Sequence, residues 1–225
     1  MFWRNIVQRL TGEARTLAFA GLQPVSGQLL ARQANFLVLD LETSGLDAKQ
    51  HHILSAGWVC IDQLRLPLDA SFYCTVRPSD TQPHTLGQSA VIHGLHQADL
   101  ASGLTEAELL REFIHAASDR VLVCHHSAIE SRFLQQAFLR HYPQSPWLKF
   151  VDTLALEQQR LQRQGSVVKN NALSLNHCLE RHALPQIQAH NALEDAYGCA
   201  LLLLSQIRQR SNDLTVRSLL NPHTP

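Results

Sequence analysis

Hydrophobic and polar residues follow two different patterns along the chain. Residues 36–42 form an apolar run that carries two carboxylates, which is typical of a strand in the middle of a sheet. Elsewhere, apolar residues recur every three or four positions, which indicates amphipathic helices. Together these patterns predict strands over 36–42, 53–61, 71–76, 120–124 and 149–151, and helices after Thr105, over 128–142, after a cap at Asp152 or Thr153, over 174–182 and over 192–208.

The order of these elements predicts the fold class. Strands come first and then alternate with helices, as in an α/β domain with a mixed five-stranded sheet flanked by helices. Glycine and proline interrupt the pattern over residues 21–27, before the first strand. We therefore expect an N-terminal helical extension over 1–33, a main domain over 34–212 and a C-terminal tail over 213–225.

The predicted extension carries an apolar stripe of its own. Residues 2–10 place apolar side chains at helical spacing, which predicts an amphipathic helix. Such a stripe either packs on its own domain or docks on a partner. Packing is the more common case.

Composition narrows the functional classes. The chain has 225 residues, of which 45% are hydrophobic, and this is enough for one sizeable core. The 19 basic and 19 acidic residues give zero net charge. This balance excludes a strongly basic nucleic-acid-binding tail, but not a local basic patch.

Cysteine usage and hydropathy indicate the compartment. The five cysteines are scattered and form no C-x-x-C pair, so we expect neither a disulfide framework nor a structural zinc site. The N-terminus lacks the layout of a signal peptide, and no apolar run approaches the ~20 residues that span a bilayer. We expect a cytoplasmic protein without membrane attachment.

Two carboxylates give the strongest chemical signal. Asp40 and Glu42 are two positions apart on a predicted strand, so their side chains point to the same face. Like charges this close either raise a pKa or require a cation. Oxygen ligands without cysteine favour hard ions such as Mg²⁺ or Mn²⁺. The alternative is a strand end at which both acids are simply solvated.

Two further acids, Asp195 and Glu130, are each expected in the first turn of a predicted helix. Asn191 is a suitable helix cap, which would place Asp195 in the first helical turn and His190 in the adjoining loop. Glu130 is expected in the first turn of a helix that follows a strand. Ligands of α/β sheets gather at such carboxyl ends.

These segments, taken in order, resemble the DEDDh family of 3′–5′ exonucleases, which have the ribonuclease H-like fold. Residues 40–45 (DLETSG) match the first motif, and residues 190–195 (HNALED) match the third. Residues 91–95 (VIHGL) and 152–154 (DTL) echo two other stretches of the family. The resemblance extends over about residues 35–210. The family includes the proofreading subunit of bacterial replicative DNA polymerase.

The resemblance implies an activity and a set of site residues. It implies a metal-dependent exonuclease that releases nucleoside monophosphates from the 3′ end of single-stranded nucleic acid, with DNA favoured over RNA. Two Mg²⁺ or Mn²⁺ ions would serve each site, and a polymerase is an implied partner. The implied metal ligands are Asp40, Glu42, Glu130 and Asp195, the general base is His190, and the nucleotide-binding residues are Thr43, Leu46 and His93.

The second motif departs from the family pattern. Residues 125–130 read HHSAIE, where the family has His-Asn-Ala-x-Phe-Asp. Glu130 thus replaces an aspartate, and its carboxylate is one methylene further from the backbone. This difference leaves open a second reading, in which the protein is a catalytically weakened nucleic-acid-binding or polymerase-associated subunit.

One short segment suggests another partner. Residues 63–68 (QLRLPL) resemble the peptide by which bacterial polymerase factors bind the sliding clamp. Such a peptide must be extended and accessible. Here it falls in a predicted turn between strands, where its leucines are expected to belong to the core.

Overall fold

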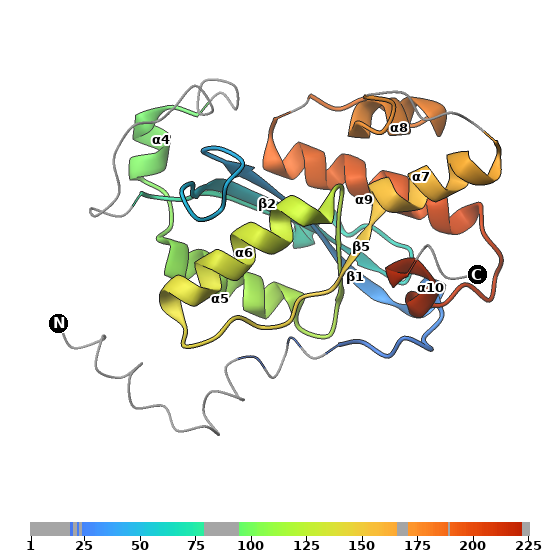
Figure 1. Cartoon of the computed structure of the whole chain (residues 1–225), viewed down its shortest axis with the longest axis horizontal. Coiled ribbons are helices and arrows are strands. Elements are labelled where there is room, and N and C mark those ends of the chain that lie inside the picture. Colours follow the sequence, from blue (N-terminus) through green and yellow to red (C-terminus); the bar gives the residue numbers. More distant parts are fainter. Residues whose placement is uncertain are drawn as a thin grey trace.

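The computed structural model describes residues 19, 22, 24–78, 95–165, 171–188 and 190–221. Its centre is a five-stranded sheet with the order β3-β2-β1-β4-β5. The pairs β1–β2 and β2–β3 are antiparallel, whereas β1–β4 and β4–β5 are parallel. The predicted mixed sheet is therefore confirmed (Figure 1). The strands are β1 (Asn35–Thr43), β2 (Ile53–Asp62), β3 (Phe72–Thr75), β4 (Val121–Cys124) and β5 (Phe150–Asp152).

Side chains of β1 alternate between two core clusters, one on each face of the sheet. Leu37 and Leu39 belong to the first core cluster, which includes residues of α5 (Glu106–Ala117) and α6 (Ser127–His141). Phe36 and Val38 belong to the second core cluster on the opposite face. Because side chains alternate along a strand, Asp40 and Glu42 continue the face of Phe36 and Val38.

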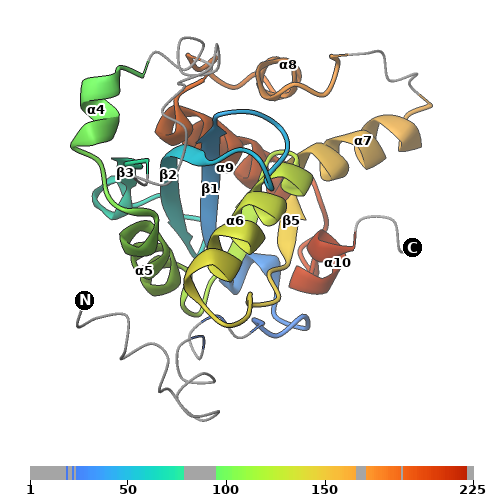
Figure 2. The ribbon, with the colours of Figure 1, turned by 60° about the vertical axis from the view of Figure 1, so that its left-hand side comes forward.

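The second face is covered by helices from the C-terminal half of the chain. The long helix α9 (Ala192–Arg208) packs against β1 and β2, and α7 (Thr153–Arg163) and α10 (Val216–Leu220) complete this side. The short helix α8 (Leu175–Arg181) packs on the outside of α9. Figure 2 shows α6 and α9 on opposite sides of the sheet.

Two predicted helix caps are confirmed. The Thr105 hydroxyl accepts a hydrogen bond from the Glu108 amide, and the Glu108 carboxylate accepts one from the Thr105 amide, so both orphan amides are satisfied. The Asn191 side chain accepts hydrogen bonds from the amides of Leu193 and Glu194. This cap fixes the start of α9 at the residue that the sequence predicts.

Two short helices were not predicted. Helix α10 lies in the segment expected to be a tail, and α4 (Gln97–Ala101) precedes α5. Each has five residues, too few to display a helical repeat in the sequence. Thr215 forms a β-bridge with Leu30, so the two predicted flanking segments meet beside the main domain. The boundaries at residues 33 and 213 stay a prediction, and the helix predicted over 2–10 lies outside the described residues.

The clamp-like segment 63–68 forms a tight turn. Asp62 and Arg65 exchange two backbone hydrogen bonds, and Gln63 and Leu64 between them have φ angles of 48° and 65°. Leu64 and Leu66 pack against the second core cluster. The segment is therefore not an extended peptide in this fold, and its described leucines contact the core as the sequence predicts.

Candidate active site

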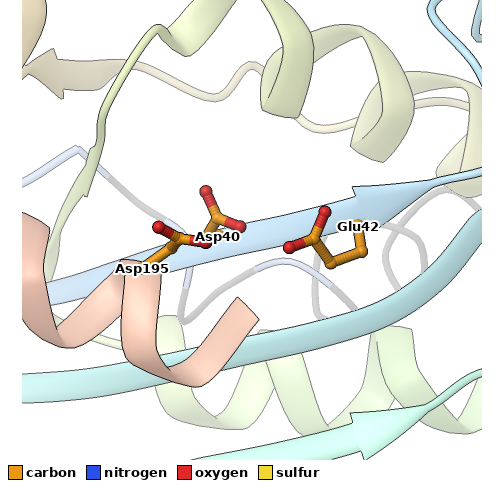
Figure 3. A group of neighbouring side chains, drawn as sticks. All are labelled: Asp40, Glu42 and Asp195. Atoms are coloured by element: carbon orange, nitrogen blue, oxygen red, sulfur yellow. The ribbon is translucent and has the colours of Figure 1, made fainter. Parts of the chain in front are cut away.

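Three carboxylates from two elements meet near the carboxyl end of the central strand β1. Asp40 and Glu42 project from β1, and Asp195 projects from the first turn of α9 (Figure 3). One carboxylate oxygen of each lies within 4.8 Å of the others. Glu42 is 7% exposed, and Asp40 and Asp195 are partly buried. The predicted convergence of these three acids is thus what the fold produces.

A glycine allows α9 to approach the sheet so closely. Gly57 of β2 is paired with Asp40 of β1, and an added Cβ at Gly57 would lie 2.4 Å from the backbone nitrogen of Leu193. No side chain fits in that space, because the obstacle is backbone. Sequence reasoning did not single out Gly57, although a glycine inside a strand is a known sign of close backbone approach.

The cluster is electrostatically strained in the absence of a cation. Burial raises the pKa of Asp40 well above its usual range, and the neighbouring carboxylates, Glu130 first among them, raise it further. Burial and the charge of Asp195 raise the pKa of Glu42 to about 7. Burial also raises the pKa of Asp195. Like charges in a poorly solvated site cannot all ionise at neutral pH without a positive partner.

Glu130 lies beside this cluster. It is in the first turn of α6, is only 3% exposed, and contributes more than any other charge to the raised pKa of Asp40. Burial raises the pKa of Glu130 itself to about 8. Its Oε2 atom is buried and has no hydrogen-bond partner among the described residues. A buried carboxylate oxygen left in this state is a suitable ligand for a cation.

Asp152 connects the helix that carries Glu130 to the helix that follows it. The Asp152 carboxylate accepts hydrogen bonds from the amides of His126 (3.0 Å) and Ser127 (2.9 Å), at the start of α6. It also accepts one from the amide of Leu154 (3.0 Å), at the start of α7. The sequence predicted a cap for α7 at this point, but not that the same carboxylate also caps α6.

The two histidines at the start of the second motif, His125 and His126, lie in different surroundings. His125 contacts the Thr153 hydroxyl through Nδ1 (2.9 Å) and the carbonyl oxygen of Leu173 through Nε2 (2.8 Å). Burial lowers the pKa of His125, so the ring is neutral and donates to the Leu173 carbonyl. His126 is exposed and has a left-handed φ of 84° at the N-cap of α6.

The other predicted site residues lie around the same end of β1. His190 is exposed and precedes the first turn of α9, and its amide donates a hydrogen bond to the Asp195 carboxylate (2.9 Å). The buried Thr43 donates its hydroxyl hydrogen to the carbonyl oxygen of Gly45 (2.8 Å). Leu46, in the loop after β1, is 79% exposed. His93 lies outside the described residues.

Comparison with known families decides the classification. The exonuclease family model RNase_T matches residues 37–203, which include every acid described above. The chain belongs to this exonuclease family. The predicted DEDDh family and ribonuclease H-like fold are thereby confirmed.

Several known proteins are similar to this chain to different extents. It is 29% identical over 172 residues to the PolC-type DNA polymerase III of Thermotoga maritima; the match covers 76% of this chain but 12% of the polymerase. The nuclease domain of 3′hExo, a DEDDh family member solved with rAMP, has a TM-score of 0.66 at 16% identity and covers 82% of this chain and 96% of that domain. Exonuclease X, solved with 5′-overhanging duplex DNA, has a TM-score of 0.57 at 19% identity. The match covers 80% of this chain and 97% of the Exonuclease X chain.

The donor set of this site fits hard divalent cations. All the donors at this end of β1 are carboxylate oxygens, three of them clustered, and Glu130 adds a buried oxygen without a partner. Mg²⁺ and Mn²⁺ prefer such ligands. The exonuclease family is metal-dependent, in agreement with this fit. No helix within the described ranges is both long enough and apolar enough to span a membrane.

Proposed function

We propose that the protein removes nucleoside monophosphates from the 3′ end of single-stranded nucleic acid, with DNA favoured. The observation that carries this proposal is the meeting of Asp40, Glu42 and Asp195 within 4.8 Å, beside the buried Glu130. Four acids with raised pKa values near one end of β1 are costly to the fold, and a phosphodiester-cleaving metal site accounts for their presence.

The carboxylates would hold two ions, Mg²⁺ or Mn²⁺. The charges of the other three acids all raise the pKa of Asp40, which would therefore contact both ions, while Glu42 and Asp195 would complete one coordination shell. Glu130 would serve the second ion through its partnerless Oε2. When bound, the ions would lower the pKa of a water molecule and neutralise charge on the phosphate.

His190 would act as the general base. Its backbone amide is fixed to the Asp195 carboxylate, which holds this exposed residue at the rim of the cluster. The imidazole would accept a proton from the water that attacks the phosphorus atom, and would then release it to solvent. The left-handed φ of 73° at His190 turns the chain sharply into α9 and brings the residue to this position.

The loop after β1 would bind the terminal nucleotide. Thr43 fixes the start of this loop through Gly45, and Leu46 presents an exposed apolar side chain suited to contact with a base. His93 is proposed to lie near the same nucleotide. DNA is favoured because the curated relative is a DNA polymerase and Exonuclease X was solved with DNA, although 3′hExo was solved with rAMP.

A polymerase partner and a cytoplasmic location follow from the same relationship. The matching relatives are PolC-type DNA polymerases, and the segment that matches this chain makes up 12% of their length. We therefore propose association with a polymerase in the cytoplasm.

One observation favours the second function, a binding subunit with weak catalysis. The carboxylate of Glu130 is not part of the group of three within 4.8 Å. If it does not reach the second ion, the strand would bind without being cleaved efficiently.

One assay separates the two functions. Matched DNA and RNA oligomers, labelled at the 5′ end, are incubated with the protein and Mg²⁺ or Mn²⁺, with Asp40→Ala as the blank. We expect a ladder of shortened DNA with the wild type only, and its loss with a chelator. Binding without any shortening in either ion would favour the weakened subunit, and shortening that a chelator leaves unchanged would refute the metal-dependent mechanism.

A further inference from the structure

A basic cavity lies at the far end of α9 from the carboxylate cluster. Its volume is about 250 Å³. Arg208, at the end of α9, is thirteen residues beyond Asp195, which corresponds to about 20 Å along the helix. The residues that line it include three arginines, Arg32, Arg208 and Arg210, and three apolar residues, Leu64, Ile207 and Leu214.

The three arginines of this cavity form no close ion pair with a described residue, although Asp213 lies within electrostatic range of Arg32. Among the residues that the structure describes, no carboxylate forms an ion pair with any of them. Arg210 donates to the neutral amide oxygen of Gln159 at 3.3 Å, and burial together with the charge of Arg163 lowers its pKa. The Asp213 carboxylate accepts a hydrogen bond from the Ser211 hydroxyl, and this bond, with the charge of Arg32 as a smaller cause, lowers the pKa of Asp213.

Of the three arginines, Arg210 is partly buried, whereas Arg32 and Arg208 are exposed. Two arginine side chains that are partly buried elsewhere in the described chain are paired with acids. Arg140 forms a two-point contact with Glu106, and Arg160 forms one with Glu157. The cavity gathers three cationic side chains, and Asp213 is the one described acid whose pKa a charge of this group affects. The resulting excess of positive charge favours an anion from outside the chain.

The turn between Asp62 and Arg65, whose backbone conformation is unfavourable for its residues, contributes Leu64 to the lining of the cavity. Gln63 and Leu64 both have left-handed φ angles, a conformation in which glycine or asparagine is usual. This turn places the Leu64 side chain against the cavity and the second core cluster. Backbone conformations of this kind persist where the surrounding structure, or a function, requires them.

We propose that this cavity binds a nucleotide unit, with its phosphate held by Arg32 and Arg208 and its sugar or base against Leu64 and Ile207. Guanidinium groups match phosphate oxygens in pairs and also stack on bases. The volume is several times the ~30 Å³ of a water molecule, so it accommodates more than a phosphate alone. The nucleotide comes either free, as the product of the proposed exonuclease, or as part of a strand whose 3′ end lies at the carboxylates; the proposal in this form rests on the proposed function.

Binding measurements test the cavity without any need for hydrolysis. In the presence of a chelator, the affinities for dAMP, a DNA tetramer and a DNA 20-mer are measured at one fixed salt concentration, because phosphate contacts weaken with salt. The variants are Arg32→Glu and Arg208→Glu, both at exposed positions. Arg111→Glu is the matched control, since Arg111 is 63% exposed on α5 and the net charge changes equally.

For at least one of the three ligands, we expect both cavity variants to lose affinity at least tenfold. The control should change little for any of them. Loss confined to dAMP identifies a free-nucleotide site, and loss for the 20-mer but not the tetramer identifies a site for the continuing strand. Equal affinities of the cavity variants and the control for all three ligands would overturn the proposal. Shortening of the tetramer by wild type with Mg²⁺ or Mn²⁺, scored separately, tests the proposed function alone.

Discussion

The carboxylate of Asp152 accepts two hydrogen bonds from Ser127, one from its amide and one from its hydroxyl, both at 2.9 Å. This contact fixes the start of α6 to the end of β5. Glu130 is three residues further along α6, so its position depends on a residue that does not itself belong to the three-carboxylate cluster. Asp152 is thus a positioning residue for the proposed second metal ligand.

Replacing Asp152 tests this role. Asp152→Asn keeps one oxygen acceptor but loses the charge and the second acceptor, so we expect a loss of about 1–2 kcal/mol of stability. We also expect kcat to fall about tenfold or more with little change in KM, because a displaced ligand impairs the chemical step. Asp99→Asn is the control, since Asp99 caps the remote helix α4. Equal kcat in both variants would show that Asp152 acts on stability alone.

Glu130 itself is tested by two substitutions. Glu130→Gln keeps the shape of the side chain but removes the charge, and we expect at least a hundredfold loss of kcat with the fold intact. Glu130→Asp restores the residue usual in the family but withdraws the carboxylate by one methylene. A misplacement of 1 Å costs on the order of a hundredfold, so we expect this variant to be slower as well. Oligonucleotide turnover over a Mn²⁺ titration measures both; full activity of Glu130→Gln would exclude Glu130 as a ligand.

The raised pKa of Glu42 predicts how stability depends on pH without metal. The pKa is about 7 in the folded protein, against 4.5 in the unfolded chain, so the folded state binds more protons between these values. Stability is therefore greatest below pH 4.5 as far as this group is concerned, and it decreases as pH rises through 7. For Glu42 alone the decrease between pH 5 and 8 is roughly 2–3 kcal/mol.

Urea unfolding in chelator at pH 5 and pH 8 measures this effect. We expect Glu42→Gln to be more stable than wild type at pH 8 and similar to it at pH 5. Added Mg²⁺ should stabilise the wild type more at pH 8, where the carboxylates ionise to bind it. A wild-type stability in chelator that rises from pH 5 to pH 8, together with no gain in Glu42→Gln, would contradict the raised pKa.

Local signals in the sequence predicted much of this architecture. The alternation over β1 placed Asp40 and Glu42 on one face, and the Asn191 cap fixed where α9 begins. Both features depend on neighbours within a few residues. The convergence of Asp195 with the strand acids could be predicted only through the family resemblance, because no local pattern relates residues so far apart in the chain.

Non-local features were not accessible from the sequence. The shared capping of α6 and α7 by Asp152 joins segments 25 residues apart. The partnerless oxygen of Glu130 depends on how α6 packs, and the close approach at Gly57 depends on where α9 crosses the sheet. These properties arise from packing between elements, which a sequence pattern does not record.

The close approach of α9 to Gly57 predicts that even a methyl group at this position disturbs the site. Gly57→Ala would place a methyl group 2.4 Å from the backbone of Leu193, so the start of α9 must move away from β2. Asp195 would move with it, and we expect kcat to fall at least a hundredfold. Gly27→Ala is the control, because the nearest atom there, at 3.3 Å, belongs to the side chain of Arg217. A folded Gly57→Ala protein with normal kcat would show that the carboxylate geometry tolerates this displacement.

The exposed side chain of Leu46 gives the last prediction. At 79% exposure Leu46 contributes little to the core, so Leu46→Ala should leave the thermal unfolding midpoint within about 1 °C of wild type. If the side chain contacts the terminal base, its loss removes a stacking or apolar contact worth about 1–3 kcal/mol, and kcat/KM should fall about tenfold. Leu139→Ala, at a leucine 49% exposed on α6, is the matched control. A fall in kcat/KM for Leu46→Ala but not for Leu139→Ala would place the 3′ end beside the loop after β1, whereas equal values for both variants would place it elsewhere.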